Sequence, residues 1–242
     1  MANLDHSHHW QAIRERLENV GSPNYVRDFI YGSIDGTVTT FAIVSGVVGA
    51  GLANHTIIIL GLANVFADGF SMAASNYLAT RSEVDERELI HLYEKTQIKE
   101  NPLGEKEEIR QIFYAKGFRG DDLEKIVNVV SQNEHEWLKI MLQEEYGIGL
   151  NVRNPWKSGI STFIAFVICG LLPLFPFIFN LDHSFLISSI IAGISFFVVG
   201  ALKSQWSLES FYVSGIKTFL IGLISSLIAY FAGSFLEGRF LS

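Results

Sequence analysis

The charged residues of this chain are strongly segregated, and this feature constrains the fold more than any other. Between Arg81 and Lys157 lie 12 of the 18 Lys and Arg residues and 16 of the 25 Asp and Glu residues. The stretches on either side are long and apolar, and hydrophobic residues make up 49% of the chain. About twenty mostly apolar residues in a helix cross the ~30 Å hydrocarbon core of a bilayer. The sequence therefore predicts an all-α integral membrane protein.

Five stretches of the sequence are long and apolar enough to span a membrane. Short turns at Ala53–His55 and Leu181–Ser184 separate the first span from the second and the third from the fourth. The five predicted transmembrane helices are Phe29–Leu52, Thr56–Thr80, Pro155–Asn180, Phe185–Lys203 and Gly215–Leu236.

A polar, acidic segment separates the second span from the third. Its helical periodicity is broken at Asn101–Gly104, Gly117–Gly120 and Gly147–Gly149. These breaks predict three or four short helices, of which the first continues out of the second span. The predicted organisation is an N-terminal segment with a short amphipathic helix at 1–23, spans 1–2 at 24–80, the acidic insert at 81–154 and spans 3–5 at 155–242.

Lys and Arg next to the spans predict the orientation, because cytoplasmic loops carry an excess of these residues. Arg14, Arg16 and Arg27 precede the first span, and Lys203 and Lys217 bracket the last loop, whereas the two short turns have none. We therefore expect the N-terminus, the insert and the 204–214 loop in the cytosol. Five spans then place the C-terminus outside, with Arg239 as the exception to the rule.

Composition restricts the partners and the chemistry. A formal net charge of -7 argues against nucleic acid, which needs a basic surface, and favours a cationic ligand. The single cysteine, Cys169, excludes a disulfide or a Cys-rich zinc site within one chain. No His or Lys stands in mid-span to activate a serine, so the sequence predicts no enzyme.

Two aspartates lie within the predicted spans, where a carboxylate is costly and marks a functional site. Asp35 is in the first span, between the small residues Gly32 and Gly36, a spacing that lets helices approach closely. Asp68 is near the middle of the second span and belongs to a polar stripe with a four-residue repeat. The members of this stripe are Asn64, Asp68, Met72 and Asn76.

This stripe has two interpretations. Carboxylate and amide oxygens with one thioether suit a borderline divalent cation such as Fe²⁺, whereas Mg²⁺ or Ca²⁺ would not recruit Met72. Alternatively, the polar residues hold helices together and Met72 fills a gap in the packing. The presence of two acids favours a cation path.

The insert repeats oxygen and sulfur side chains three or four residues apart, so that each pair shares a helix face. Converging faces would bind metal, although isolated pairs are also usual on solvated helices. The pairs are Glu94 with Gln97, Glu105 with Glu108, and Met141 with Glu145. A ferritin-like di-iron centre needs two Glu-x-x-His motifs, and only Glu88 to His91 provides one. The cluster His6, His8 and His9 could bind metal only loosely.

Three sequence segments together resemble the vacuolar iron transporter family, in a form typical of its bacterial members. These are DGTVTTFAIVSGVVGAGL from Asp35, ADGFSMAASNYLATRSE from Ala67, and the acidic insert ending in EEYGI. The resemblance runs from about Tyr25 to the C-terminus and is most specific in the first two spans. It implies a homodimer of five-span protomers that exchanges cytosolic Fe²⁺, and often Mn²⁺ or other divalent ions, for protons.

The resemblance also implies roles for individual residues. Asp35 and Met72 match the family's translocation ligands, and five insert residues fall on positions like its metal ligands, namely Glu94, Glu105, Glu108, Met141 and Glu145. The sequence departs from the family at Asn64, where a Glu is expected and Asp68 could carry the charge. It departs again at Gln97 and Leu142, where Glu and Met are expected. Glu107, Glu144 or His91 could compensate.

The predicted function is a proton-coupled transporter of Fe²⁺ and Mn²⁺ out of the cytosol, with Co²⁺ and Zn²⁺ as further candidate ions. The metal would pass from the insert to Asp35 and then to Met72 and Asp68 between two protomers, while protons return. The rival functions are a membrane-anchored iron sensor or store and a di-iron oxidase without transport. A bacterial source implies the cytoplasmic membrane, and a eukaryotic source the vacuolar membrane.

Overall fold

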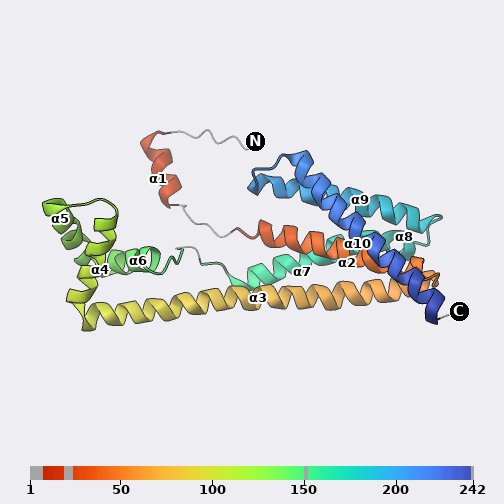
Figure 1. Ribbon diagram of the computed structural model, residues 1–242, viewed down its shortest axis with the longest axis horizontal. Coiled ribbons are helices and arrows are strands. Elements are labelled where there is room, and N and C mark those ends of the chain that lie inside the picture. Colours follow the sequence, from red (N-terminus) through yellow and green to blue (C-terminus); the bar gives the residue numbers. More distant parts are fainter. Residues whose placement is uncertain (1–7, 19–23, 150–151, 241–242) are drawn as a thin grey trace. The chain divides into compact units, whose positions relative to one another are not determined.

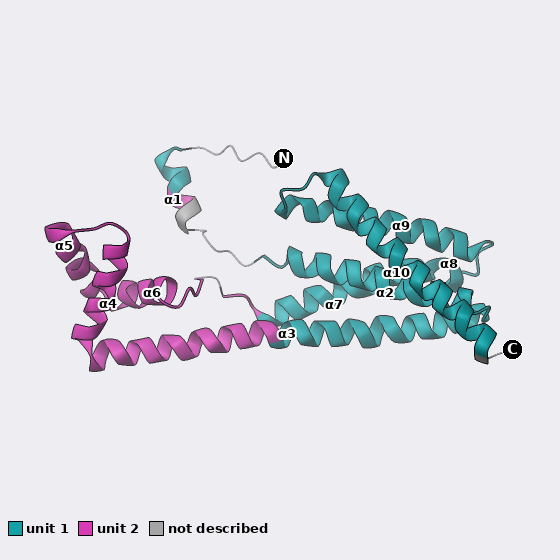
Figure 2. Cartoon of the chain, viewed as in Figure 1, with its two compact units in different colours: residues 1–13, 24–78, 155–242 teal, residues 14–23, 79–154 magenta. Residues whose placement is uncertain are grey.

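The structure, a computed structural model, describes residues 8–18, 24–149 and 152–240, and all regular secondary structure there is helical (Figure 1). The chain divides into two compact units (Figure 2). Unit 1 comprises residues 1–13, 24–78 and 155–242, and unit 2 comprises residues 14–23 and 79–154. Helix α3 (Asn54–Glu100) contributes its first part to unit 1 and its remainder to unit 2.

Five helical segments in the described residues are long and apolar enough to cross a membrane. This agrees with the predicted all-α membrane protein. They are α2 (Val26–Gly49), α3, the segment from α7 (Pro155–Leu171) through α8 (Phe175–Ile178), the segment from α9 (Ser184–Lys203) to Trp206, and α10 (Phe211–Phe240).

Several predicted boundaries are wrong by a few residues. The first turn lies at 50–53 rather than 53–55, because Gly51 takes a left-handed conformation with φ 62° and α3 begins at Asn54. Helix α10 begins four residues before the predicted Gly215 and runs past Leu236. Its apolar surface begins earlier than predicted, with Phe211, Tyr212 and Val213.

The predicted single helix over Pro155–Asn180 is also wrong. After α7 the chain forms a 3-10 turn, η1 (Leu172–Leu174), and then the short helix α8. Pro173 and Pro176 explain the interruption, because proline has no N–H to donate and its ring clashes with the preceding turn. Asn180, with φ 48°, lies beyond the helix in the following turn.

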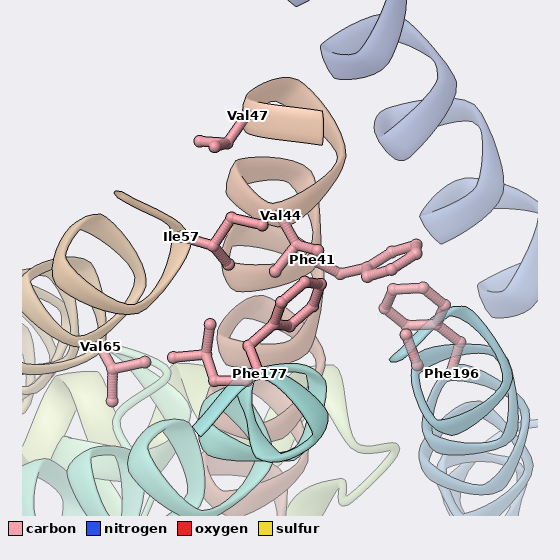
Figure 3. Close-up of a cluster of buried hydrophobic side chains, with 9 residues drawn as sticks. Phe41, Val44, Val47, Ile57, Val65, Phe177 and Phe196 are labelled. Atoms are coloured by element: carbon pink, nitrogen blue, oxygen red, sulfur yellow. The ribbon is translucent and has the colours of Figure 1, made fainter. Parts of the chain in front are cut away.

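Unit 1 is built around α2. Glycines let it approach its neighbours: a Cβ on Gly36 would lie 2.5 Å from the Phe166 carbonyl oxygen of α7, and a Cβ on Gly49 would lie 2.2 Å from that of Tyr230 on α10. The predicted close approach at Gly32 and Gly36 is thus confirmed, with α7 as the partner. Near the carboxyl end of α2, an apolar cluster includes Phe41, Val44 and Phe177 (Figure 3).

Unit 2 contains the end of α3 and three further helices, α4 (Pro102–Ala115), α5 (Gly120–Ser131) and α6 (Glu134–Glu144). Helix α3 runs without a break from the second span to Glu100, as predicted. Asn101 then caps α4, accepting a hydrogen bond from the backbone N–H of Gly104, and Asn133 caps α6 in the same way. The sequence pattern did not predict the break at Asn133. Helix α1 (Trp10–Glu18) matches the predicted N-terminal helix.

Candidate functional site

Within unit 1, two predicted site residues, one on α2 and one on α3, lie within electrostatic range of one another. The carboxyl groups of Asp35 and Asp68 are close enough for their charges to repel, and both side chains are half-buried. One turn further along α2, Thr39 donates a hydrogen bond to the backbone oxygen of Asp35 at 2.8 Å and accepts one from Asn64 at 3.5 Å. The structure thus brings Asp35, Asp68 and Asn64 together, and it adds Thr39.

The register of the two helices explains this pairing. Helices α2 and α3 run in opposite directions, so one turn forward from Asp35 to Thr39 corresponds to one turn back from Asp68 to Asn64. Met72 lies one turn from Asp68 on the other side and is half-buried. We call these five residues the α2–α3 seam. Thr39 was missed because a threonine in an apolar span gives no signal until the partner helix is placed.

The fourth member of the predicted stripe has a structural role. Asn76 donates hydrogen bonds to the hydroxyl of Thr162 at 2.7 Å and to the backbone oxygen of Ser158 at 3.3 Å, both on α7. The Ser158 hydroxyl in turn donates to the Asp28 carboxylate of α2 at 3.2 Å. For Asn76 the interpretation as an interhelical contact is therefore correct. Asp28 was missed because it precedes the predicted first span.

Within unit 2, carboxyl groups from α3, from α4 and from the residue that caps α6 gather into what we call the insert cluster. Glu94 of α3 and Glu105 of α4 are buried, with exposed fractions of 2% and 4%, whereas Glu108 and Glu145 are exposed. Burial first, and then repulsion by Glu108, Glu94 and Glu145, raises the pKa of Glu105 to about 7. Partial desolvation of its carboxyl group, and then repulsion by Glu94 and Glu108, likewise raise the pKa of Glu145. The four carboxyl groups therefore share one electrostatic environment.

Two oxygens of the insert cluster have no hydrogen-bond donor. Tyr146 donates to Glu94 Oε1 at 2.7 Å, but the buried Oε2 atoms of Glu94 and Glu105 have no hydrogen-bond partner. A buried, unpaired carboxylate oxygen is costly, and a cation would compensate it. In the part of the chain that the structure describes, no three His, Cys, Asp or Glu side chains are already arranged around a common metal position.

The remaining predicted ligands differ in their surroundings. Met141 is fully buried in the apolar core of unit 2, together with Leu142. Gln97 is half-buried on α3. Glu107 and Glu144, the possible substitutes, form ion pairs with Arg110 and Lys116. His91 is half-buried and Glu88 is exposed. Of the N-terminal histidines, His6 lies outside the described residues.

Together these observations define a class: a polytopic α-helical membrane protein with acidic residues between two of its spans and an acidic helical unit. The model of the VIT family matches residues 26–234. The chain belongs to this family, so the resemblance inferred from the sequence is confirmed.

Several named relatives are similar over most of the chain. The chain is 30% identical to the vacuolar iron transporter of Plasmodium berghei (strain Anka), over 96% of this chain and 89% of the relative. It is 32% identical to that of Toxoplasma gondii, over 89% and 76%, and 30% identical to that of Centaurea cyanus, over 95% of both chains. These are transporters by name, which confirms the prediction that the chain is not an enzyme.

Proposed function

We propose that this protein transports Fe²⁺ out of the cytosol in exchange for protons. The observation that carries the proposal is that Asp35 and Asp68, in the membrane-spanning part of unit 1, lie close enough for their charges to repel. The names of the relatives support iron as the transported ion. Under this proposal the five apolar helices all span the membrane, and 81–154 is a cytosolic insert.

The mutual repulsion of these two carboxyl groups supplies a physical basis for exchange. Two like charges in a medium of low dielectric constant repel strongly, and either a divalent cation or a proton relieves the repulsion. Metal binding therefore disfavours protonation of these carboxyl groups, and protonation disfavours metal binding. Alternating access of such a site to the two sides of a membrane couples the two fluxes.

Neighbouring groups of the α2–α3 seam shape the cation site. Met72 offers a thioether and Asn64 an amide oxygen, a mixed set that suits Fe²⁺ and also Mn²⁺, Co²⁺ or Zn²⁺. Because Asn64 is neutral, we assign the proton-carrying role to Asp35 and Asp68. A homodimer, with the path between two protomers, completes this proposal.

The insert cluster is proposed to collect the metal before transport. Glu94 and Glu105 would bind it through their unpaired oxygens, with Glu108 and Glu145 as exposed partners that admit the ion. Gln97 and Met141 are the other ligands proposed here. Loss of cluster carboxylates should mainly raise the metal concentration at half-maximal transport and leave the maximal rate nearly unchanged.

The test is Fe²⁺ uptake into vesicles containing the purified protein, with and without a pH gradient, while internal pH is recorded. We expect gradient-stimulated uptake with proton counterflow, and loss of at least nine-tenths of the rate in Asp35→Ala. Asp121→Ala, on an exposed acid of α5, is the matched control and should transport normally. Normal transport by Asp35→Ala would refute the assignment.

The same experiment separates the rival functions. Metal binding without flux would favour an iron sensor or store that uses the insert cluster alone. Oxygen consumption on addition of Fe²⁺ would indicate a di-iron oxidase. The two neighbouring aspartates favour transport over both rivals, since neither rival needs acids between membrane spans.

A further inference from the structure

A cavity of about 350 Å³ lies among α2, α9 and α10 in unit 1. Phe41 and Ser45 line it from α2, and further lining residues from the other two helices include Ser189, Gly193, Phe219 and Ser226. Figure 3 shows the rings of Phe41 and Phe196 close together in this region, with their centroids 6.4 Å apart. The cavity is thus lined mainly by aromatic rings and small residues.

The cavity is separate from the α2–α3 seam. At 3.6 residues per turn, Phe41 lies about 120° around α2 from Asp35 and about 160° from Thr39. Among the residues that the structure describes, no charged side chain lines the cavity. The cavity therefore offers nothing to a cation and is not an extension of the proposed transport path.

Two of the four hydroxyl groups in its wall donate hydrogen bonds within their own helices. Ser189 donates to the backbone oxygen of Phe185 at 2.8 Å, and Ser226 donates to that of Leu223 at 2.9 Å. A cavity with such walls gives water too few partners to be stably filled, whereas an apolar molecule gains dispersion contacts. The occupant that fits is therefore apolar.

The dimensions select among apolar occupants. Along α10 the lining extends from Phe219 to Tyr230, which at 1.5 Å per residue corresponds to about 16 Å parallel to the helix. If the cavity volume is spread over this length, the cavity is a slot narrower than an α-helix, whose diameter with side chains is about 10 Å. We call it the slot from here on. A helix of another chain is excluded, whereas an extended hydrocarbon chain fits. We propose that the slot binds one acyl chain of a membrane lipid.

The surroundings support this assignment. Helices α2, α9 and α10 are all long and apolar enough to span a bilayer, so acyl chains are the medium around them. Leu223 and Leu227 line the slot and are also 41% and 46% exposed, which gives the chain a route in from the apolar outer surface of α10. This proposal does not depend on metal transport.

The test uses phosphatidylcholine vesicles with a diazirine in one acyl chain of a fraction of the lipid. After irradiation, mass spectrometry locates the label in the full-length protein. We expect label on the residues that line the slot, including Phe41. Ser189→Phe, which fills the slot, should lower the Phe41 label at least five-fold. Ile190→Phe adds the same ring at the neighbouring, 54% exposed position and should leave it within two-fold.

A second variant guards against misfolding of the first. Ser226→Phe fills the slot from α10, with Ile228→Phe, at a 65% exposed position, as its control. The proposal is overturned if label falls only on the outer face of α10, or if both filling variants keep the label at Phe41. Because labelling needs no metal or pH gradient, this outcome is distinct from failure of transport.

Discussion

At the scale of single residues, Glu105 determines how the insert responds to pH. Its folded pKa of about 7 lies above the usual 4.5, so the folded insert retains a proton that the unfolded chain releases. This group therefore stabilises the fold below about pH 4.5, and that contribution is lost as the pH rises through about 7. Metal binding has the opposite dependence, since the proton must leave first.

We therefore predict that the affinity of the insert cluster for Mn²⁺ rises about tenfold per pH unit below about pH 7 and then levels off. Glu105→Gln should weaken binding and flatten this dependence. Titration calorimetry of the full-length protein at about pH 5.5, 6.5 and 7.5 measures both effects. Glu107→Gln is the control, because hydrogen bonds from Gln111 and Arg110 lower the pKa of Glu107 out of this range. An unchanged slope in Glu105→Gln would contradict the prediction.

Asn76 provides a second test at this scale. Its amide makes two hydrogen bonds to α7, so Asn76→Ala should lower the free energy of unfolding by about 1 kcal/mol, the usual value for such contacts between membrane helices. Unfolding in mixed micelles with increasing dodecyl sulfate measures this change. Ser75→Ala, at the exposed neighbouring position, should have almost no effect. Equal effects of the two substitutions would mean that the contacts with α7 contribute nothing.

At the scale of helices, the close approach of α2 and α10 depends on glycine. A Cβ on Gly233 would lie only 2.1 Å from the backbone oxygen of Gly46, and this backbone atom cannot yield as a flexible side chain would. Gly233→Ala should therefore lower stability by about 1–3 kcal/mol, the usual cost of overpacking. The same unfolding assay measures it. Gly238→Ala, where a Cβ meets nothing within 4 Å, should be neutral, and a loss there as large as at Gly233 would refute the packing argument.

The sequence predicted the helical spans better than their interruptions and their partners. Hydropathy locates a span because length and apolarity depend on each stretch alone. The interruption at Pro173 and Pro176 was missed because proline is tolerated within membrane spans, so its presence does not by itself end a helix. The pairing of Thr39 with Asn64 depends on the register of two helices, which no single-helix pattern contains. The burial of Glu94 and Glu105 likewise required the packed unit.

At the scale of the whole molecule, the proposed function depends on topology. Metal collected by the insert can be exported only if the insert is in the cytosol, and the distribution of Lys and Arg predicts this orientation. A single reporter cysteine in each segment tests it, because the chain's one cysteine, Cys169, is buried and gives a low background.

For this test, Asp182→Cys places a thiol in the exposed loop after α8, and Asn128→Cys places one on the exposed face of α5. In intact bacteria expressing the chain, we expect a membrane-impermeant maleimide to label the first variant. The second should be labelled only after permeabilisation. The reverse pattern would place the insert outside the cytosol. An external insert could collect only metal that is about to enter the cell, so the proposed direction of transport would be wrong.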